Sequence, residues 1–235
     1  MVIPDATLTV GDLHFALQRS ARRKTMEITV DREGELLIKA PPDVSEAKLR
    51  KFVEEKRFWV YTKLAEKDRL NRARPRREFV DGEGFPYLGR SYRLKLVDEQ
   101  DVPLKLANGR FMMRRCNLPD ARHHLVKWYC QRATPWLASR VADYRHRMEV
   151  NPGGLKVQDL GYRWGSCGKG EWLYFHWKAI LLPAHIAEYL VVHEMAHLHE
   201  PHHTASFWLL VERAMPDYER RMAWLAEHGM HVEGI

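Results

Sequence analysis

The sequence of 235 residues contains few cysteines and no long hydrophobic run. A membrane-spanning helix needs about 18 consecutive apolar residues, and no segment approaches that length, so we expect no membrane partner. The first residues lack the basic and apolar regions of a signal peptide. The three cysteines, Cys116, Cys130 and Cys167, form no CxxC pair, which argues against a disulfide framework. These absences predict a cytoplasmic protein.

Negative charge is scarce in the first 183 residues, which carry 35 Lys and Arg residues against 23 Asp and Glu residues. Residues 184–235 reverse the balance, with 3 basic residues against 8 acidic ones. The densest basic stretch is 69–77, with five arginines. Such a stretch can contact nucleic acid, although a solvated helix end explains it equally simply and no nucleic-acid-binding motif accompanies it. Nucleic acid therefore stays a candidate partner of the basic N-terminal half.

The spacing of apolar and turn-forming residues predicts a β-rich first half. Residues 25–30 and 35–40 alternate as strands do, and a helix is expected from Ser45 to about residue 70. Residues 103–107 and 110–115 flank Asn108-Gly109, a strong hairpin signal. We expect residues 1–117 to form a β-rich region with one long helix.

The second half is expected to form a separate domain, residues 118–235, with a long helix, two strands and further helices. Its predicted strands are 155–162 and 171–179. Its predicted helices are 119–150, 184–200, 204–214 and 217–228. Helices and strands in both halves predict an α+β fold class.

Histidine is abundant, with 13 residues, of which eight lie in the last 52. Within the predicted helix 184–200, His193, Glu194 and His197 form an HExxH motif. Histidines at i and i+4 project from one face of a helix and can share a Zn²⁺ ion. Glu194 lies beside that position and can act as general base on a water molecule. Surface histidines without a shared role are the simpler alternative, which the apolar surroundings of the motif disfavour.

A catalytic zinc site needs a third protein ligand. The candidates are His202, His203 and Glu212, since His199 points away from the HExxH face. His203 follows His197 by six residues, the spacing of the third histidine in the extended HExxHxxGxxH motif. We favour His203 and leave His202 and Glu212 open.

Other groups of the site are less determined by the sequence. A donor should stabilise the developing oxyanion, and the candidates are Tyr218, His228 and His231. Glu212, Asp217 or Glu219 could hold the imidazoles in place.

The motif and its surroundings resemble the YgjP-like metallopeptidases, relatives of the SprT-like and minigluzincin-type zincins. The resemblance rests on residues 191–198 (Val-Val-His-Glu-Met-Ala-His-Leu), His203, and the Phe207-Trp208 pair. Residues 162–167 (Tyr-Arg-Trp-Gly-Ser-Cys) fit as well. The resemblance covers nearly the whole chain and is most specific in its last 80 residues.

The resemblance implies a zincin-like catalytic domain, in which a small sheet packs on the active-site helix. It implies a zinc-dependent metallopeptidase that acts on a protein or peptide, with His193, His197 and His203 as metal ligands and Glu194 as the catalytic residue. It also implies that a strand before the helix pairs with the substrate. We place that strand at 171–179, with Trp172, Tyr174 and His176 as substrate-binding residues.

Two other functions remain open at this point. HExxH activates a water molecule without choosing its target, so a zinc hydrolase of a non-peptide substrate is one alternative. A nucleic-acid-associated protease of the SprT type is the other, because of the basic stretch at 69–77. A purely structural zinc site is disfavoured by the intact Glu194.

Overall fold

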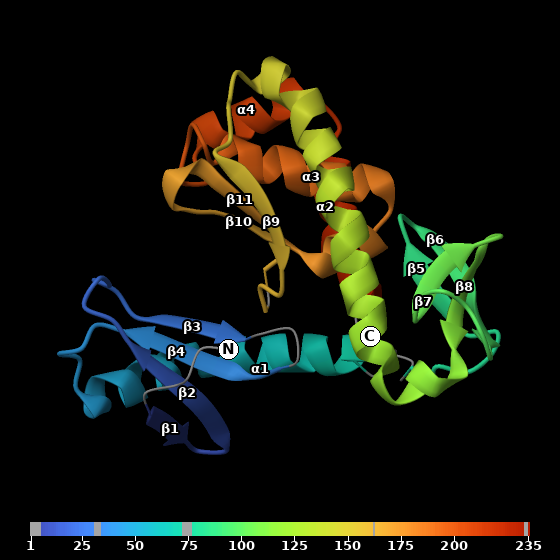
Figure 1. Ribbon diagram of the computed structural model, residues 1–235. Coiled ribbons are helices and arrows are strands. Elements are labelled where there is room, and N and C mark those ends of the chain that lie inside the picture. Colours follow the sequence, from blue (N-terminus) through green and yellow to red (C-terminus); the bar gives the residue numbers. More distant parts are fainter. Residues whose placement is uncertain (1–5, 31–33, 72–76, 162, 233–234) are drawn as a thin grey trace. The chain divides into compact units, whose positions relative to one another are not determined.

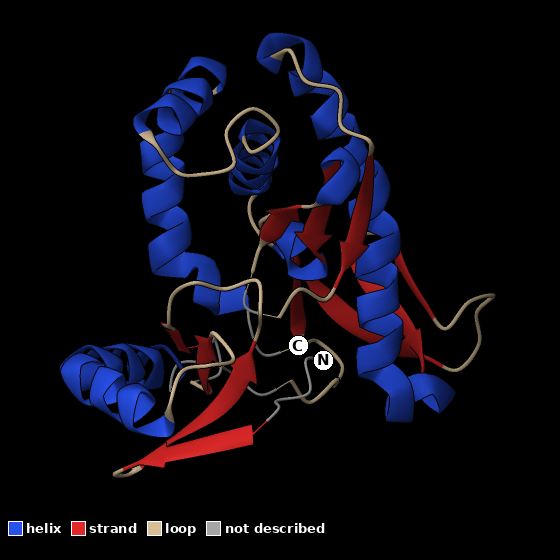
Figure 2. Ribbon diagram, turned by 90° about the vertical axis from the view of Figure 1, so that its left-hand side faces the viewer, coloured by secondary structure: helices blue, strands red, loops and turns tan. Residues whose placement is uncertain are grey.

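The computed structural model describes residues 6–30, 34–71, 77–161, 163–232 and 235 (Figure 1). The chain divides into two compact units, Met1–Arg74 and Pro75–Ile235. Helices and strands occur in both units (Figure 2), so the predicted α+β fold class is confirmed. Among the described helices, none is both long and apolar enough to cross a membrane.

The first unit is a four-stranded sheet with one helix packed on it. In sheet order its strands are β1 (Ala6–Val10), β2 (Leu13–Arg19), β4 (Leu36–Ala40) and β3 (Glu27–Val30). The central pair β2–β4 is parallel, and the two outer pairs are antiparallel. Helix α1 (Glu46–Asn71) buries Leu49, Val53 and Val60 in the same apolar core as Phe15 and Ile38.

The hairpin β1–β2 is absent from the predicted elements. Its two-residue turn is Gly11-Asp12, and Gly11 has a φ of 62°, a conformation that glycine adopts without strain. A Gly-Asp pair between two alternating runs is a recognised hairpin signal. The sequence therefore carried the information for this hairpin.

The second unit begins with a sheet that repeats the topology of the first. In sheet order its strands are β5 (Gly84–Tyr87), β6 (Arg90–Val97), β8 (Arg110–Arg114) and β7 (Leu104–Ala107). The central pair β6–β8 is again parallel and the outer pairs antiparallel, and β7 occupies the edge position that β3 holds in the first unit. The hairpin at Asn108-Gly109 forms as predicted.

Helix α2 (Ala121–Met148) joins this sheet to the rest of the second unit. Its buried Leu125, Tyr129 and Leu137 share one apolar core with Phe111 of β8 and Phe175 of β11. The expected domain boundary at 117/118 therefore falls inside the second unit, between β8 and α2. The physical reason is that the β5–β8 sheet buries its apolar face in the same core as α2.

A three-stranded sheet and three helices complete the second unit. In sheet order the strands are β10 (Gly165–Cys167), β11 (Trp172–His176) and β9 (Gly154–Gln158). The pair β10–β11 is antiparallel and the pair β11–β9 is parallel. The helices are α3 (Ala184–Ala196), α4 (Ala205–Ala214) and α5 (Tyr218–His228). Short 3₁₀ turns lie at Arg115–Asp120, Lys169–Glu171, Trp177–Leu181 and Gly229–Val232.

Candidate metal centre

Helix α3 carries the HExxH motif through the centre of the second unit. Most of its residues are buried, among them Ile186, Leu190 and Val191. His193 and His197 keep part of their surface accessible, and His197 is the residue at which the helix ends. Within residues 189–197 these two are the residues that are not fully buried, so their imidazoles can be reached by a ligand.

The structure brings His203 to this pair. One ring nitrogen from each of His193, His197 and His203 lies within 4.8 Å of the others. The Nε2 atoms of His203 and His193 are 3.0 Å apart. Three neutral imidazoles with converging nitrogen atoms suit the ligand preferences of Zn²⁺ and leave a fourth position open. The donor set therefore fits a catalytic metal ion.

The start of α4 holds His203 in place. Thr204 caps the helix, because its hydroxyl accepts a hydrogen bond from the Phe207 N–H at 3.3 Å. The Phe207 ring contacts all three imidazoles, with centroid distances of 4.6 to 5.0 Å. Trp208 stacks on His203 at 5.7 Å. The chain after α3 thus returns to the cluster at the capped start of α4, where the rings of Phe207 and Trp208 form an aromatic wall beside the imidazoles.

The other two candidate ligands lie outside the cluster. His202 is exposed, and its backbone N–H donates to the Glu200 carboxylate at 3.3 Å. Glu212 is exposed on α4. Within the described residues, neither belongs to the group of side chains close enough to share a metal ion.

The outer nitrogens of two imidazoles have partners of their own. His193 Nδ1 lies 3.4 Å from the Tyr189 hydroxyl, and His197 Nδ1 lies 3.1 Å from the Glu200 carbonyl oxygen. Such contacts fix ring orientation and tautomer. They are made by Tyr189 and a carbonyl group instead of the expected Glu212, Asp217 or Glu219. Tyr189 precedes His193 by one helical turn, so this spacing could have revealed it.

His193 and His197 are held in the neutral form that metal binding requires. Burial, with the neighbouring His197 and His203 rings, lowers the pKa of His193 to about 3. Burial also lowers the pKa of His197. A neutral ring keeps a lone pair available at neutral pH.

Glu194 is enclosed between α3 and β10. Its side chain is 6% exposed, and a Cβ atom on Gly165 would lie 2.5 Å from its Oε1 atom. Burial raises the pKa of Glu194 to about 8, against the opposing effects of Arg163 and of a hydrogen bond from the Cys167 N–H. A carboxyl group with this pKa can take up and release a proton near neutral pH.

The strand that we expected to face the substrate is central in the sheet, so the predicted exposed edge at 171–179 is wrong. β11 pairs with β10 on one side and with β9 on the other, which leaves its backbone no free edge. Trp172 is 41% exposed, Tyr174 is partly buried and His176 is 1% exposed. His176 lies 3.4 Å from Asp159 and accepts a hydrogen bond from the Lys178 N–H.

β10 provides the free edge instead. Hydrogen bonds join Trp164 to His176 and Gly168 to Trp172 at its two ends. Because antiparallel pairs alternate, the backbone groups of Gly165 and Cys167 point away from β11. The Cys167 N–H that reaches Glu194 lies on this side. β10 is absent from the predicted strands, because it has only three residues and begins with a glycine.

The expected oxyanion donors lie at different places. Tyr218 stacks on Trp208 at 5.4 Å, which joins it to the aromatic wall of the cluster. His228 stacks on Trp224 at 4.7 Å. The side chain of His231 lies outside the described part of the structure. Tyr218 is thus linked to His203 through the Trp208 ring, which stacks on both.

Two comparisons with known proteins give a match. A family model described as YgjP-like, metallopeptidase domain, matches residues 24–228. The crystal structure of the metallopeptidase zymogen of Pyrococcus abyssi abylysin is similar at 16% sequence identity and a TM-score of 0.36, covering 39% of this chain and 93% of that chain. The comparison with curated proteins gives no match.

Proposed function

The chain belongs to the YgjP-like metallopeptidase family, and on that premise we propose that it is a zinc-dependent peptidase with its active site at His193, His197 and His203. The observation that carries the proposal is the convergence of three imidazole nitrogens within 4.8 Å beside a buried carboxyl group. The three cysteines are free, which fits the cytoplasmic setting that belongs to the same proposal.

In this proposal Glu194 moves the protons of the reaction, beside a metal ion that His193, His197 and His203 would hold. Zn²⁺ bound by three neutral imidazoles would polarise a carbonyl group and lower the pKa of a water molecule in its open position. Glu194 accepts the proton of the attacking water on a carboxylate oxygen. It then donates that proton to the leaving amine, which its pKa of about 8 favours near neutral pH.

The chain's own backbone supplies substrate alignment in this proposal. A peptide in extended form would pair with the free edge of β10, through the outward N–H and C=O groups of Gly165. This edge lies over Glu194, because a Cβ atom at position 165 would meet the Glu194 side chain. Trp172 is exposed at the surface of the same sheet, and we still predict that its side chain contacts the substrate.

The basic stretch 69–77 bears on a second function, a nucleic-acid-associated protease. Residues 72–76 lie outside the described residues, and Arg77 is 3.8 Å from Glu83 in an ion pair. No contact of the described residues favours nucleic acid specifically, so the peptidase is the function we propose.

The test combines metal analysis with a peptide-library digest. We expect the purified wild type to contain zinc and to cleave peptides, and Glu194→Gln to keep the zinc while losing about 100-fold or more in rate. His203→Ala should lose zinc, whereas His202→Ala and Glu212→Gln should keep it.

Three results would contradict the proposal. Full peptidase activity of Glu194→Gln would remove Glu194 from the reaction. Zinc loss in His202→Ala but not in His203→Ala would exchange the third ligand. Hydrolysis of small amides or esters without cleavage of any library peptide would favour the non-peptide hydrolase.

A further inference from the structure

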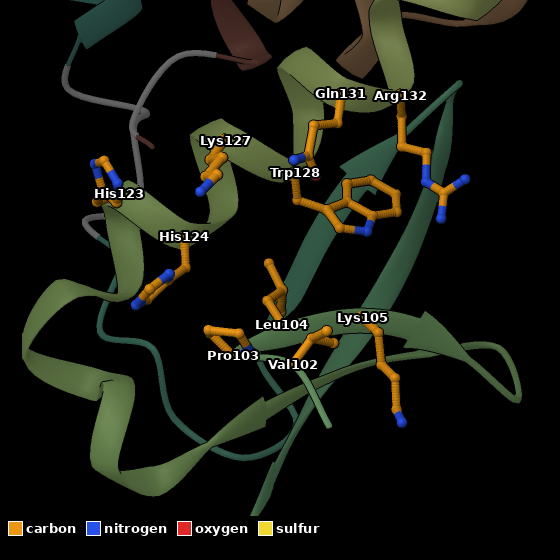
Figure 3. A pocket seen from close by; sticks show the side chains of 10 residues that line it. All are labelled: Val102, Pro103, Leu104, Lys105, His123, His124, Lys127, Trp128, Gln131 and Arg132. Atoms are coloured by element: carbon orange, nitrogen blue, oxygen red, sulfur yellow. The ribbon is translucent and has the colours of Figure 1, made fainter. Parts of the chain in front are cut away.

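A second cavity, of about 380 Å³, lies between strand β7 and the first turns of helix α2 (Figure 3). It shares no residue with the histidine cluster. Its floor is apolar and is formed by Val102, Leu104 and Trp128. Val102 is 39% exposed, which is high for a valine beside a tryptophan. The volume falls in the range of ligand-binding pockets.

The rim of this cavity is cationic. Lys127 and Arg132 come from α2 and Lys105 from β7, and His123 and His124 add two imidazoles. Figure 3 shows these side chains arranged around the Trp128 ring. None of the residues that line the cavity is acidic. Coulomb attraction therefore favours an anionic ligand here.

Two of the cations remain available to such a ligand. Lys105 is paired with Asp101, whereas Arg132 lies 5.5 Å above the Trp128 ring and has no carboxylate partner among the residues that the structure describes. Among the described residues, no ion pair engages Lys127. An incoming carboxylate can thus pair with Lys127 and Arg132 without displacing an existing anion.

The cavity also borders a free strand edge. β7 is an edge strand in its sheet, and the Arg114 N–H donates to the Pro103 carbonyl oxygen at 3.1 Å. Hydrogen-bonded and non-hydrogen-bonded residue pairs alternate along this antiparallel hairpin. The backbone N–H and C=O groups of Leu104 and Leu106 therefore point away from β8. Leu104 itself lines the cavity. Edges of this kind accept a further strand from another chain.

These features favour a peptide over a nucleic acid. Single-stranded nucleic acid binds through base stacking on exposed aromatic faces. Trp128 is only 6% exposed, and Tyr87 and Phe111 contact its ring at 5.1 and 4.8 Å. It therefore offers a base no open face, whereas the edge of β7 offers a peptide its backbone partners.

The cationic rim is not a by-product of the repeated architecture. The first unit has a smaller cavity at the equivalent place, between β3 and α1, lined by Ile28, Phe52, Lys56 and Trp59. That cavity has one cationic side chain. The shared sheet topology alone therefore does not account for the positive charge of the β7–α2 cavity, which comes from the particular side chains that line it.

We propose that the β7–α2 cavity binds an extended acidic peptide segment of a partner protein. The peptide backbone pairs with Leu104 and Leu106, an apolar side chain packs on the exposed Val102, and flanking carboxylates contact Lys127 and Arg132. This site is independent of the metal centre.

The test measures binding by fluorescence anisotropy with the full zinc-loaded chain carrying Glu194→Gln, so that hydrolysis does not interfere. The probe is a labelled peptide of about ten residues, with aspartates flanking a central Leu-Val pair, and its partner has asparagine at each aspartate. Lys127→Glu and Arg132→Glu are the test variants. Arg145→Glu on the same helix, about 27 Å from Lys127 along the axis, is the matched control.

We expect the acidic peptide to bind, its asparagine version to bind at least about tenfold more weakly, and both test variants to lose about tenfold in affinity. The control should change affinity by less than about twofold, and the acidic peptide with alternate backbone N-methyl groups should not bind. Equal binding of the two peptides, or unchanged affinity in both correctly folded test variants, would overturn the proposal. Tighter binding of an oligothymidylate that is lost in the same variants would replace it with a nucleic-acid site.

Discussion

Replacement of Gly165 by alanine tests whether the distance between β10 and Glu194 controls the reaction. A Cβ atom at this position would lie 2.5 Å from the Oε1 atom, 2.6 Å from the Cγ atom and 2.7 Å from the Cδ atom of Glu194. Ordinary van der Waals contacts begin at 3.4 Å. Either the Glu194 carboxyl group or β10 must therefore move by about 1 Å.

The displacement should cost more in catalysis than in metal binding. A shift of about 1 Å in a catalytic group can lower a rate about 100-fold, which corresponds to about 2.7 kcal/mol in activation free energy. The extra methyl group in a packed site should also lower the free energy of unfolding by about 1–3 kcal/mol. The three atoms nearest to a Cβ atom at position 165 all belong to Glu194, so we expect the zinc content to stay near that of the wild type.

The assay compares kcat/KM, zinc content and thermal unfolding of Gly165→Ala with those of Ser166→Ala. The side chain of Ser166 points to the opposite face of β10, so this control should retain activity. A double variant with Glu194→Asp, whose side chain is one methylene shorter, should recover stability but not activity. Wild-type kcat/KM in zinc-loaded Gly165→Ala would refute the reasoning, because Glu194 could not then act from the position described. Zinc loss in parallel with activity would assign the defect to the metal ligands instead.

Three further predictions concern the surroundings of the site. Tyr189→Phe removes the hydroxyl beside His193, and we expect zinc affinity, measured by chelator competition, to fall about tenfold with little change in folding; an unchanged affinity would exclude this contact. Thr204→Ala removes the cap of α4 and should lower the free energy of unfolding by about 1 kcal/mol in urea titrations, whereas Thr204→Ser should restore it. Burial opposes ionisation of Asp159, but a backbone N–H and the His176 ring hold the pKa of Asp159 below its ordinary value of 3.8. Its ionised form therefore stabilises the fold above about pH 4, and this contribution is lost as the pH falls through the lowered pKa. Asp159→Asn should lower the unfolding temperature at neutral pH and approach the wild type below about pH 3; a pH-independent difference would contradict this.

The metal cluster could be predicted because its determinants are local. His193 and His197 are one helical turn apart, so a helix alone brings them together. His203 follows Pro201, which cannot continue a helix beyond the end of α3 at His197, and it precedes Thr204, a residue type that caps helices. Each of these relations spans at most about ten residues, and the sequence reveals all of them.

The surroundings of Glu194 could not be predicted in the same way. The residues that enclose it, Gly165 and Cys167, precede it by more than 25 positions, and neither carries a pattern that points to a carboxyl group. Its raised pKa depends on burial by this separate strand. The sequence shows that Glu194 can act as a base, and only the packing of β10 on α3 sets its proton affinity.

The position of a strand within its sheet explains the error at residues 171–179. Alternation of Trp172, Tyr174 and His176 with apolar residues shows that two faces differ, but it contains no information on the two edges. Whether a strand lies at the edge or in the centre of its sheet depends on which other segments pair with it. Here both partners of β11, β9 and β10, are short and contain glycine. The apolar, two-sided burial of Leu173, Phe175 and His176 is what a central strand requires. An edge in this region must therefore be sought in the shortest, most glycine-rich segment beside the buried strand, where a missing side chain lets the backbone approach the Glu194 carboxyl group.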